Sequence, residues 1–172
     1  FNFLFGINNY ASDGHYQNSD FSFWRSRVQF NYFPSDRFNL KFFISANKQE
    51  RGQNDGLIFN NSKDTLLDPN LVLTANPDAY EKIFTTYSDI KLTGRFFRDT
   101  LSLTNFNIYT NNSIREYRDE ENRNSPNGIF IGKNFHSVQY GFNLNQKLYL
   151  IPFKLSQIKL LAGVKGYYNL YN

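Results

Sequence analysis

Side chains that could carry out catalysis are few. Nucleophilic catalysis requires a hydroxyl or thiol beside a base, and the chain has two histidines and no cysteine. His15 lies near Ser12, Asp13 and Ser19, which are the residue types of a catalytic triad. Exposed loops have the same composition, so we interpret His15 as a solvated loop residue. His136 lies at the start of an expected strand, and we interpret it as an interfacial residue. We therefore expect no enzymatic activity.

Acidic residues in loops could bind calcium, and loop glycines could cradle a phosphate. The acidic candidates are Asp55, Asp64, Asp68 and Asp78, and the glycine candidates are Gly52, Gly56, Gly128 and Gly132. The acidic spacing differs from that of an EF-hand loop. None of the glycines lies between a strand and a helix with the spacing of a phosphate-binding loop. We therefore expect no bound metal and no cofactor.

Charge and hydropathy narrow the class of protein. The formal net charge is +4, and Lys and Arg are interleaved with Asp and Glu, so the composition does not indicate a nucleic-acid partner. Mean hydropathy is −0.57, and no run approaches the roughly 20 apolar residues of a membrane helix. Membrane strands remain compatible with these values, because lipid-facing and lumen-facing residues alternate and cancel in any average.

Apolar and polar residues alternate over long stretches of the chain. Even positions from 24 to 32 and from 38 to 46 are mostly apolar, odd positions are mostly polar, and turn residues lie between the two runs. This pattern predicts a hairpin of two long strands. Similar runs over about 1–10, 86–96, 101–110, 138–150 and 158–168 bring the expected total to about seven strands.

Two local irregularities are expected within this pattern. The apolar parity changes between Leu103 and Phe106, which predicts a β-bulge near Thr104 or Asn105. Residues 77–84 begin with a proline, and they could form one helical turn with Asn76 as its cap.

Long and short connections alternate along the chain. Long polar loops are expected at about 11–20, 48–84 and 111–134, and short turns at about 34–36, 98–99 and 151–156. This layout is typical of an outer-membrane barrel, whose loops are extracellular and whose turns are periplasmic. We expect residues 1–172 to be one partial transmembrane β-barrel domain, an all-β antiparallel up-and-down meander that forms an open, curved segment of a large barrel.

A soluble β-sandwich would also alternate, because it buries one face of each sheet. Strand length distinguishes the two classes. Sandwich strands commonly have about 5 to 6 residues, whereas strands that cross a bilayer need about 9 to 11. The alternating runs here cover roughly a dozen residues, which favours the membrane class.

The two faces of such a sheet would have different partners. Candidates for the lipid-facing side and its aromatic girdles are Trp24, Phe30, Tyr32, Phe42, Phe96, Tyr140, Phe142 and Tyr168. Candidates for the lumen are Arg25, Arg27, Lys41, Asp89, Lys91, Arg95, Lys159 and Lys165. We expect the lumen set to contact a plug domain or to form ion pairs; guiding an anionic ligand is the alternative. The loop from Arg51 to Phe84 has apolar patches and is expected to cover the barrel mouth or to pack against other loops.

The chain has the character of an excised piece. Phe1 already lies in an apolar run with no signal peptide before it, and an odd number of strands differs from the even number of single-chain bacterial barrels. We expect the piece not to close into a barrel by itself.

Two segments carry a resemblance to a known family. Asp13-Gly14-His15-Tyr16-Gln17-Asn18-Ser19-Asp20-Phe21, leading into Trp24-Arg25-Ser26-Arg27, resembles a recurrent hairpin of TonB-dependent receptors. Leu160-Leu161-Ala162-Gly163-Val164-Lys165-Gly166-Tyr167-Tyr168 is similar to a strand of the same family. The segments share the family's glycine and aromatic spacing.

That resemblance implies a protein of the Gram-negative outer membrane with about 22 strands. It further implies outer-membrane lipid, a plug domain, the remaining strands and the TonB complex as partners. The implied function is import of a scarce ligand, such as a metal chelate or an oligomeric nutrient. A passive porin or a barrel enzyme is the second hypothesis, and a soluble β-sandwich binding module is the third.

Overall fold

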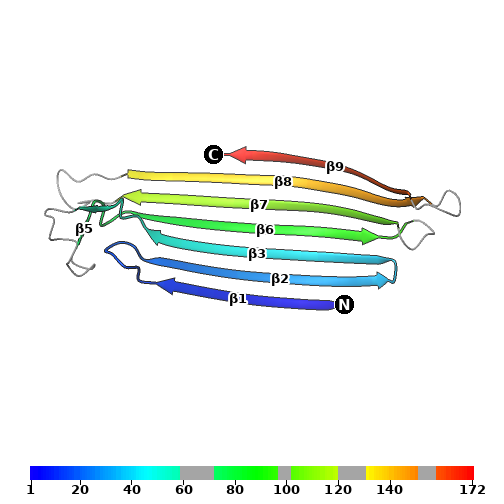
Figure 1. Ribbon diagram of the computed structural model, residues 1–172, viewed down its shortest axis with the longest axis horizontal. Helices are drawn as coiled ribbons and strands as arrows, with labels where there is room; N and C mark the ends of the chain where they lie inside the picture. Colours follow the sequence, from blue (N-terminus) through cyan, green and yellow to red (C-terminus); the bar gives the residue numbers. More distant parts are fainter. Residues whose placement is uncertain (59–71, 97–101, 120–130, 151–157) are drawn as a thin grey trace.

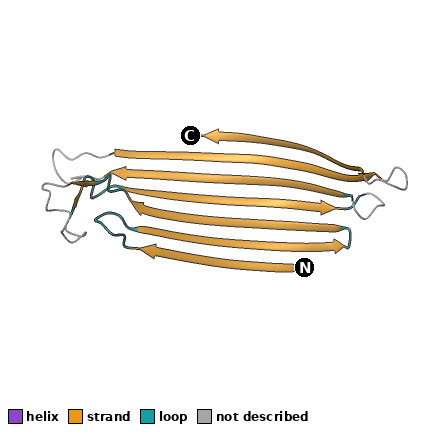
Figure 2. Ribbon diagram, in the orientation of Figure 1, coloured by secondary structure: helices purple, strands orange, loops and turns teal. Residues whose placement is uncertain are grey.

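The computed structural model describes residues 1–58, 72–96, 102–119, 131–150 and 158–172. The described residues form strands and irregular connections, with no helix among them (Figures 1 and 2). In particular, the described part of the chain has no helix that is long and apolar enough to cross a membrane. The strands are β1 (Asn2–Ser12), β2 (Phe21–Ser35), β3 (Phe38–Gly52), β4 (Leu57–Ile58), β5 (Leu73–Thr74), β6 (Tyr80–Gly94), β7 (Leu103–Asp119), β8 (Ile131–Leu150) and β9 (Ile158–Tyr171).

Seven of these strands form one antiparallel sheet in the order β1-β2-β3-β6-β7-β8-β9. Neighbours in the sheet follow one another along the chain, apart from the two-residue strands β4 and β5, which pair with each other. The sheet is open, with β1 and β9 at its two edges (Figure 1). The predicted all-β meander of about seven long strands is therefore confirmed.

The β2–β3 hairpin shows how the sequence sets the register. Ser35 pairs with Phe38 across a turn of Asp36 and Arg37. The pairing then shifts between Tyr32 and Ser35, where Pro34 has no N–H group to donate. The turn predicted at 34–36 thus lies one residue later. Turns predicted at 98–99 and 151–156 lie outside the described residues.

Several strands run further than the sequence predicted, so the loops are shorter. Residues 48–52 of β3 pair with 80–84 of β6, in a segment expected to be loop. β7 continues to Asp119 and β8 begins at Ile131, again within an expected loop, and β1 continues to Ser12. In these segments polar residues lie on both faces and the few apolar ones, such as Ile83 and Phe84, are not confined to one face. The period-2 alternation of apolar residues is therefore lost although the backbone ladder continues.

Both predicted irregularities are wrong. β7 pairs with β6 and β8 in unbroken register through Thr104 and Asn105, so there is no bulge; Leu103 simply faces the polar side at the end of its strand. Residues from Tyr80 onward belong to β6 and not to a helical turn. Asn76 nevertheless makes a cap-like bond, because its Oδ1 accepts a hydrogen bond from the Ala79 N–H at 3.1 Å.

The two faces of the sheet are chemically distinct. Register places the even-numbered residues of β2, β3, β6, β7, β8 and β9, together with the odd-numbered residues of β1, on one face, which we call the apolar face. The other face is polar. Among the described residues, the only buried hydrophobic ones are Val72 and Ala79, and no second sheet covers the apolar face. The described part of the chain therefore has no sandwich core.

Candidate functional site

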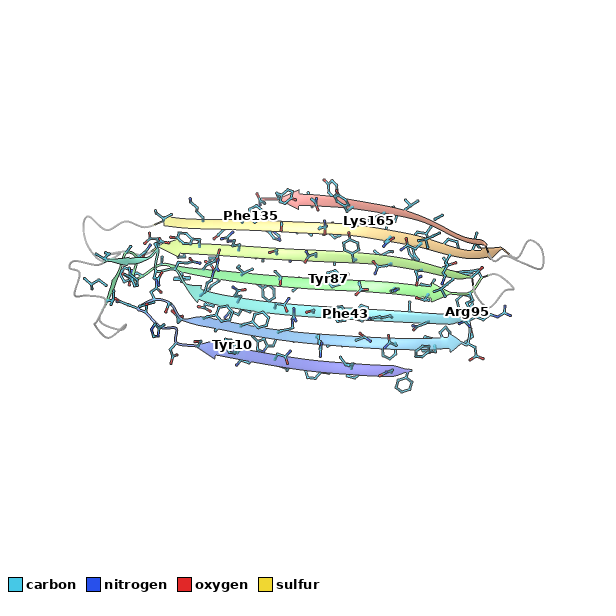
Figure 3. The ribbon with its side chains drawn as sticks, viewed as in Figure 1. Tyr10, Phe43, Tyr87, Arg95, Phe135 and Lys165 are labelled. Atoms are coloured by element: carbon cyan, nitrogen blue, oxygen red, sulfur yellow. The ribbon has the colours of Figure 1, made fainter. Side chains whose placement is uncertain are left out.

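The polar face carries most of the residues predicted to line a lumen. Arg25, Arg27, Lys41, Asp89, Lys91 and Lys165 share this face by register. Lys159 of β9 pairs with Tyr149 of β8, and the Lys159 side chain lies outside the described part of the structure. Arg95 follows the end of β6 at the turn end of the sheet, where its N–H donates to the Arg37 carbonyl (Figure 3).

Hydrogen bonds link polar side chains across neighbouring strands on this face. Arg25 Nε donates to Asn47 Oδ1 at 2.8 Å, and Asn47 Nδ2 donates to Thr85 Oγ1 at 3.0 Å. Between β6 and the next strand, β7, Asn107 Nδ2 donates to Asp89 Oδ2 at 3.0 Å. Arg25 and Asp89, two of the residues predicted to face a lumen, are thus each hydrogen-bonded to an asparagine side chain on a neighbouring strand.

Three aromatic residues cross the centre of the polar face as a ladder: Phe43 on β3, Tyr87 on β6 and Tyr109 on β7. The ring centroids of Phe43 and Tyr87 are 6.1 Å apart, and those of Tyr87 and Tyr109 are 6.2 Å apart in a stacked arrangement (Figure 3). Gly141 pairs with Tyr109 on β8, and a Cβ at Gly141 would collide with the Tyr109 ring. Sequence alternation does not predict this aromatic ladder, because the ladder depends on cross-strand register.

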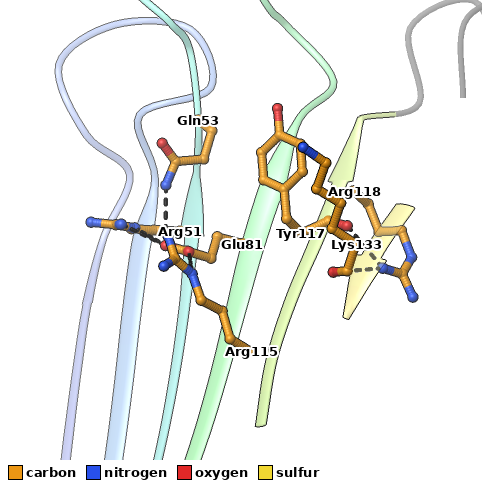
Figure 4. Close-up of polar contacts among 7 residues, drawn as sticks. All are labelled: Arg51, Gln53, Glu81, Arg115, Tyr117, Arg118 and Lys133. Atoms are coloured by element: carbon orange, nitrogen blue, oxygen red, sulfur yellow. Dashed lines mark hydrogen bonds and ion pairs between the residues drawn. The ribbon is translucent and has the colours of Figure 1, made fainter. Parts of the chain in front are cut away.

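At the loop end of the same face, Glu81 forms the centre of an ionic cluster (Figure 4). Its carboxylate is fully buried. Arg51 Nη2 lies 2.5 Å from Glu81 Oε2, Arg115 Nε contacts Glu81 Oε1, and Gln53 Nε2 donates to Oε2 at 3.3 Å. These four residues, the Glu81 cluster, join β3, β6 and β7 to the segment that follows β3.

Opposing effects act on the Glu81 carboxyl group. Burial on its own raises the pKa, but hydrogen bonds and charges from Arg51 and Arg115 outweigh it, so the pKa of Glu81 is held below its ordinary value. The carboxylate is therefore ionised at neutral pH, as a buried acid between two guanidinium groups should be.

The long β3–β6 connection is seated on this end of the polar face. Asn18 Nδ2 donates to the carbonyls of Asn76 and Ala79 at 2.9 and 2.7 Å, and Asn76 Nδ2 donates to Asp119 Oδ2 at 3.1 Å. Within the connection, Val72 and Ala79 are buried. The described part of this connection is thus hydrogen-bonded to Asn18, before β2, and to Asp119, at the end of β7. Residues 59–71 lie outside the described residues.

The residues considered for catalysis make other contacts: Ser19 Oγ and Ser12 Oγ accept hydrogen bonds from backbone N–H groups. The His15 ring packs edge-on against Tyr16 at 4.9 Å, and its backbone N–H donates to Ser19 Oγ at 3.0 Å. His136 Nε2 lies 2.7 Å from Asn112 Oδ1 on the apolar face. Within the described ranges, no group of three or more His, Cys, Asp or Glu side chains is placed to hold a metal. Asp64, Asp68 and Gly128 lie outside those ranges.

Residues predicted to face lipid lie together on the apolar face. Register places Trp24, Phe30, Tyr32, Phe42, Tyr140, Phe142 and Tyr168 there. Phe96 follows β6 and packs edge-on against Phe38 of this face at 5.2 Å. Most of these side chains are exposed, with Tyr168 at 63% and Tyr140 at 52%.

Charge on the apolar face is confined to its loop end. At the apolar-face positions of the seven strands, the formally charged residues are Lys48, Glu50, Lys82, Glu116 and Arg118, which we call the charged rim. Glu50 contacts two ammonium groups, Lys48 Nζ at 3.4 Å and Lys82 Nζ at 3.0 Å. Sequence reasoning missed the charged rim and the Glu81 cluster because it placed residues 48–84 and 111–134 in loops.

Comparison with protein-family models, curated proteins and solved structures finds no match to this chain.

Proposed function

We propose that this chain is part of a transmembrane β-barrel of the Gram-negative outer membrane, and that this barrel belongs to a TonB-dependent transporter that imports a scarce ligand such as a metal chelate or an oligomeric nutrient. One observation supports the membrane assignment above all. Seven long strands present a continuous, uncovered apolar face whose charges are confined to one end.

The dimensions of the apolar face suit a bilayer. On β3 the apolar face runs from Phe38 at the turn end to Lys48 at the charged rim. These ten steps cover about 34 Å along the strand. For a strand tilted by about 35–45°, this corresponds to about 25 Å of depth, which is the height of the apolar band of outer-membrane barrels. We call the apolar face between Phe38 and the row Trp24, Lys48 and Phe84 the apolar band.

The two edge strands support a barrel larger than this sheet. Within the part of the chain that the structure describes, β1 and β9 each pair with one neighbour only, and unpaired strand edges are not tolerated in lipid. In our proposal, further strands of the same protein pair with both edges and close the barrel. The polar face, with its cations and its aromatic ladder, then lines the lumen and contacts a plug domain.

The transporter assignment rests on the two resembling segments. Asp13 to Phe21 forms the β1–β2 connection and the first residue of β2, and Leu160 to Tyr168 lies within β9. A passive porin is the second candidate, since it would have the same two faces. The resemblance implies an imported ligand, a plug domain and the TonB complex as partners of the whole protein.

Fluorescence of Trp24, the single tryptophan, tests the membrane assignment. The protein is reconstituted in vesicles whose phospholipids carry brominated acyl chains. We expect strong quenching of Trp24 on the apolar face. A matched pair of variants in the Trp24→Phe background, Tyr140→Trp on the apolar face and Tyr109→Trp on the polar face, should be quenched and not quenched respectively. Equal quenching of this pair would contradict the proposal.

Conductance of the protein in planar bilayers separates the transporter from the porin. A plugged transporter should conduct little until denaturant loosens its plug. A steady open conductance in buffer alone would instead favour the porin.

A further inference from the structure

We infer that a pocket at the turn end of the polar face binds the C-terminal residue of a short peptide. Arg37 and Arg95 hold the peptide carboxylate, and Asn39 accepts a hydrogen bond from the last backbone N–H of the peptide. The ligand and its site lie beyond the proposed function. Only the periplasmic location of the site rests on that function, because the short turns of an outer-membrane barrel face the periplasm.

This turn-end pocket has a volume of about 310 Å³, at the lower end of the range of small-molecule sites, about 300–1,000 Å³. The β2–β3 hairpin and the adjoining ends of β6 and β7 form its walls, and the lining side chains include Phe33, Arg37, Asn39, Thr93, Arg95 and Leu103. A backbone hydrogen bond fixes this corner of the sheet, because the Arg95 N–H donates to the Arg37 carbonyl at 2.9 Å (Figure 3). The two arginines are therefore held side by side.

Both guanidinium groups are available to an anion. Arg37 and Arg95 are exposed, and within the described ranges neither forms an ion pair. Asp36 also lines the pocket, so two arginines and one aspartate give the lining a formal charge of +1. A carboxylate can accept two parallel hydrogen bonds from one guanidinium group. The charge and geometry of the pocket thus suit a carboxylate ligand.

Asn39 provides an acceptor that lacks a donor. Its Oδ1 atom is buried and has no hydrogen-bond partner among the described residues, whereas its cross-strand neighbour Thr93 already donates to Asn105 Oδ1 at 2.9 Å. A buried amide oxygen without a partner is unfavourable. Rotation about χ2 of Asn39, a torsion with a broad distribution, turns this oxygen toward the pocket, where a ligand N–H can bind it.

The last residue of a peptide combines the groups that the pocket needs. It carries a carboxylate and a backbone N–H on the same residue, and its side chain can contact the apolar part of the lining, Phe33 and Leu103. An internal peptide segment has the N–H but no terminal carboxylate, and a simple anion such as acetate has no N–H. The combination therefore distinguishes a peptide C-terminus from both.

The test measures binding of a fluorescein-labelled tripeptide, Gly-Gly-Leu, to the protein in phosphatidylcholine nanodiscs by fluorescence anisotropy. We expect the peptide with a free carboxylate to bind. The same peptide with a C-terminal amide should bind about tenfold more weakly or worse, because charge-assisted hydrogen bonds are lost. Methylation of the leucine nitrogen, which removes the N–H, should weaken binding about fivefold.

Variants assign these effects to residues. Arg37→Gln and Arg95→Gln should each weaken binding of the free-carboxylate peptide about tenfold. Asn39→Ala should weaken binding about fivefold and remove the effect of methylation, because the same hydrogen bond is already lost. Arg25→Gln is the matched control and should leave binding unchanged, since Arg25 lies on the same face but bonds to Asn47 nearer the loop end.

Equal binding of the carboxylate and amide peptides would overturn the inference, as would wild-type affinity in the Arg37→Gln/Arg95→Gln double variant. Displacement of the peptide by an equal concentration of acetate would also overturn it, because the pocket would then be a general anion site. The peptide comparisons use the wild-type protein, so they decide the matter even where a variant fails to fold. Quenching of Trp24 by brominated lipid does not depend on this pocket, so failure of the membrane proposal is recognised separately.

Discussion

Arg51 of β3 lies directly opposite Glu81 of β6, with its guanidinium Nη2 2.5 Å from the buried carboxylate Oε2. One position further along the ladder, Glu50 lies opposite Lys82 on the other face. Two successive cross-strand pairs of opposite charge thus close the loop end of the β3–β6 ladder, one on each face. Such pairs stabilise a register, because a slip by one residue would bring like charges together.

Replacing Glu81 with Gln should destabilise the protein. The substitution removes the shared acid from Arg51 and Arg115, whose side chains are about half exposed and can be partly solvated. We therefore expect the free energy of unfolding to fall by about 1–2 kcal/mol, which is less than the cost of breaking a fully buried ion pair. Urea unfolding of the protein in phospholipid vesicles measures it. Glu50→Gln, which changes a partly exposed acid, is the control and should cost less; an equal cost would argue against a special role for Glu81.

Stability should fall at acidic pH partly through Glu81, which lies on the loop side of the apolar band. The folded state lowers its pKa from the ordinary value of 4.5. The unfolded state therefore binds a proton more readily, so this contribution is complete above pH 4.5 and is lost as pH falls through the folded pKa. Unfolding free energies of the wild type and Glu81→Gln should converge below pH 4.5. A difference that stays constant down to the acid limit would contradict this assignment.

Asn18 anchors the β3–β6 connection, and its replacement should loosen that segment. Its side chain donates to two carbonyls, those of Asn76 and Ala79, and its φ of 53° is a conformation that asparagine adopts more readily than alanine. Asn18→Ala should therefore lower the free energy of local opening of this segment by about 1–2 kcal/mol, so that the segment opens more often. Hydrogen exchange of the Gln53 amide, which donates to the Ala79 carbonyl, reports the change.

Asn18→Gly separates the two causes, because glycine keeps the backbone conformation but loses the side-chain donor. Exchange rates for Asn18→Gly that equal those of the wild type would show that the two side-chain hydrogen bonds do not hold the segment.

Gly141 makes room for the aromatic ladder. A side chain at this position would collide with the Tyr109 ring, so Gly141→Ala should displace that ring from its stack with Tyr87 and cost about 1–3 kcal/mol. The cost should largely disappear in the Tyr109→Ala background. A double-mutant cycle of unfolding free energies measures this coupling, and additive effects would show that the two residues do not interact.

Sequence alternation was sufficient to predict the strands wherever one face is apolar. Residues from Leu40 to Ala46 show it plainly, and the register places the apolar ones on one face as expected. Alternation does not predict the strand at Lys48 to Gly52, which has no apolar side chain, or at Tyr80 to Phe84, where Ile83 and Phe84 lie on opposite faces, because no period of two remains there. The complementary charges of Glu50-Arg51 and Glu81-Lys82 were the signal that could have extended these strands.

The Glu81 cluster and the aromatic ladder were beyond reach of the sequence for a different reason. Phe43, Tyr87 and Tyr109 come from three strands, and their contact depends on registers that only the assembled sheet fixes. Arg115 reaches Glu81 diagonally, since the direct partner of Glu81 on β7 is Tyr117. Periodicity assigns a residue to a face; it does not assign its neighbour on the next strand.

Two neighbouring positions on β2 provide the sharpest test of the difference between faces. Val28 lies at mid-depth of the apolar band, and Gln29 follows it on the polar face. In a bilayer, Val28→Arg should cost about 2–4 kcal/mol because the charge is placed in hydrocarbon near the midplane, whereas an arginine on the lumen face remains solvated. Gln29→Arg should therefore cost well under 1 kcal/mol.

The comparison uses the free energies of unfolding of both variants in phospholipid vesicles. The two positions are adjacent on β2 and both receive an arginine. If the apolar face contacts lipid, Val28→Arg should lower the free energy of unfolding and Gln29→Arg should not. If the two arginines cost the same, the apolar face is not in hydrocarbon, because only a difference in the surroundings of the two side chains separates Val28 from Gln29.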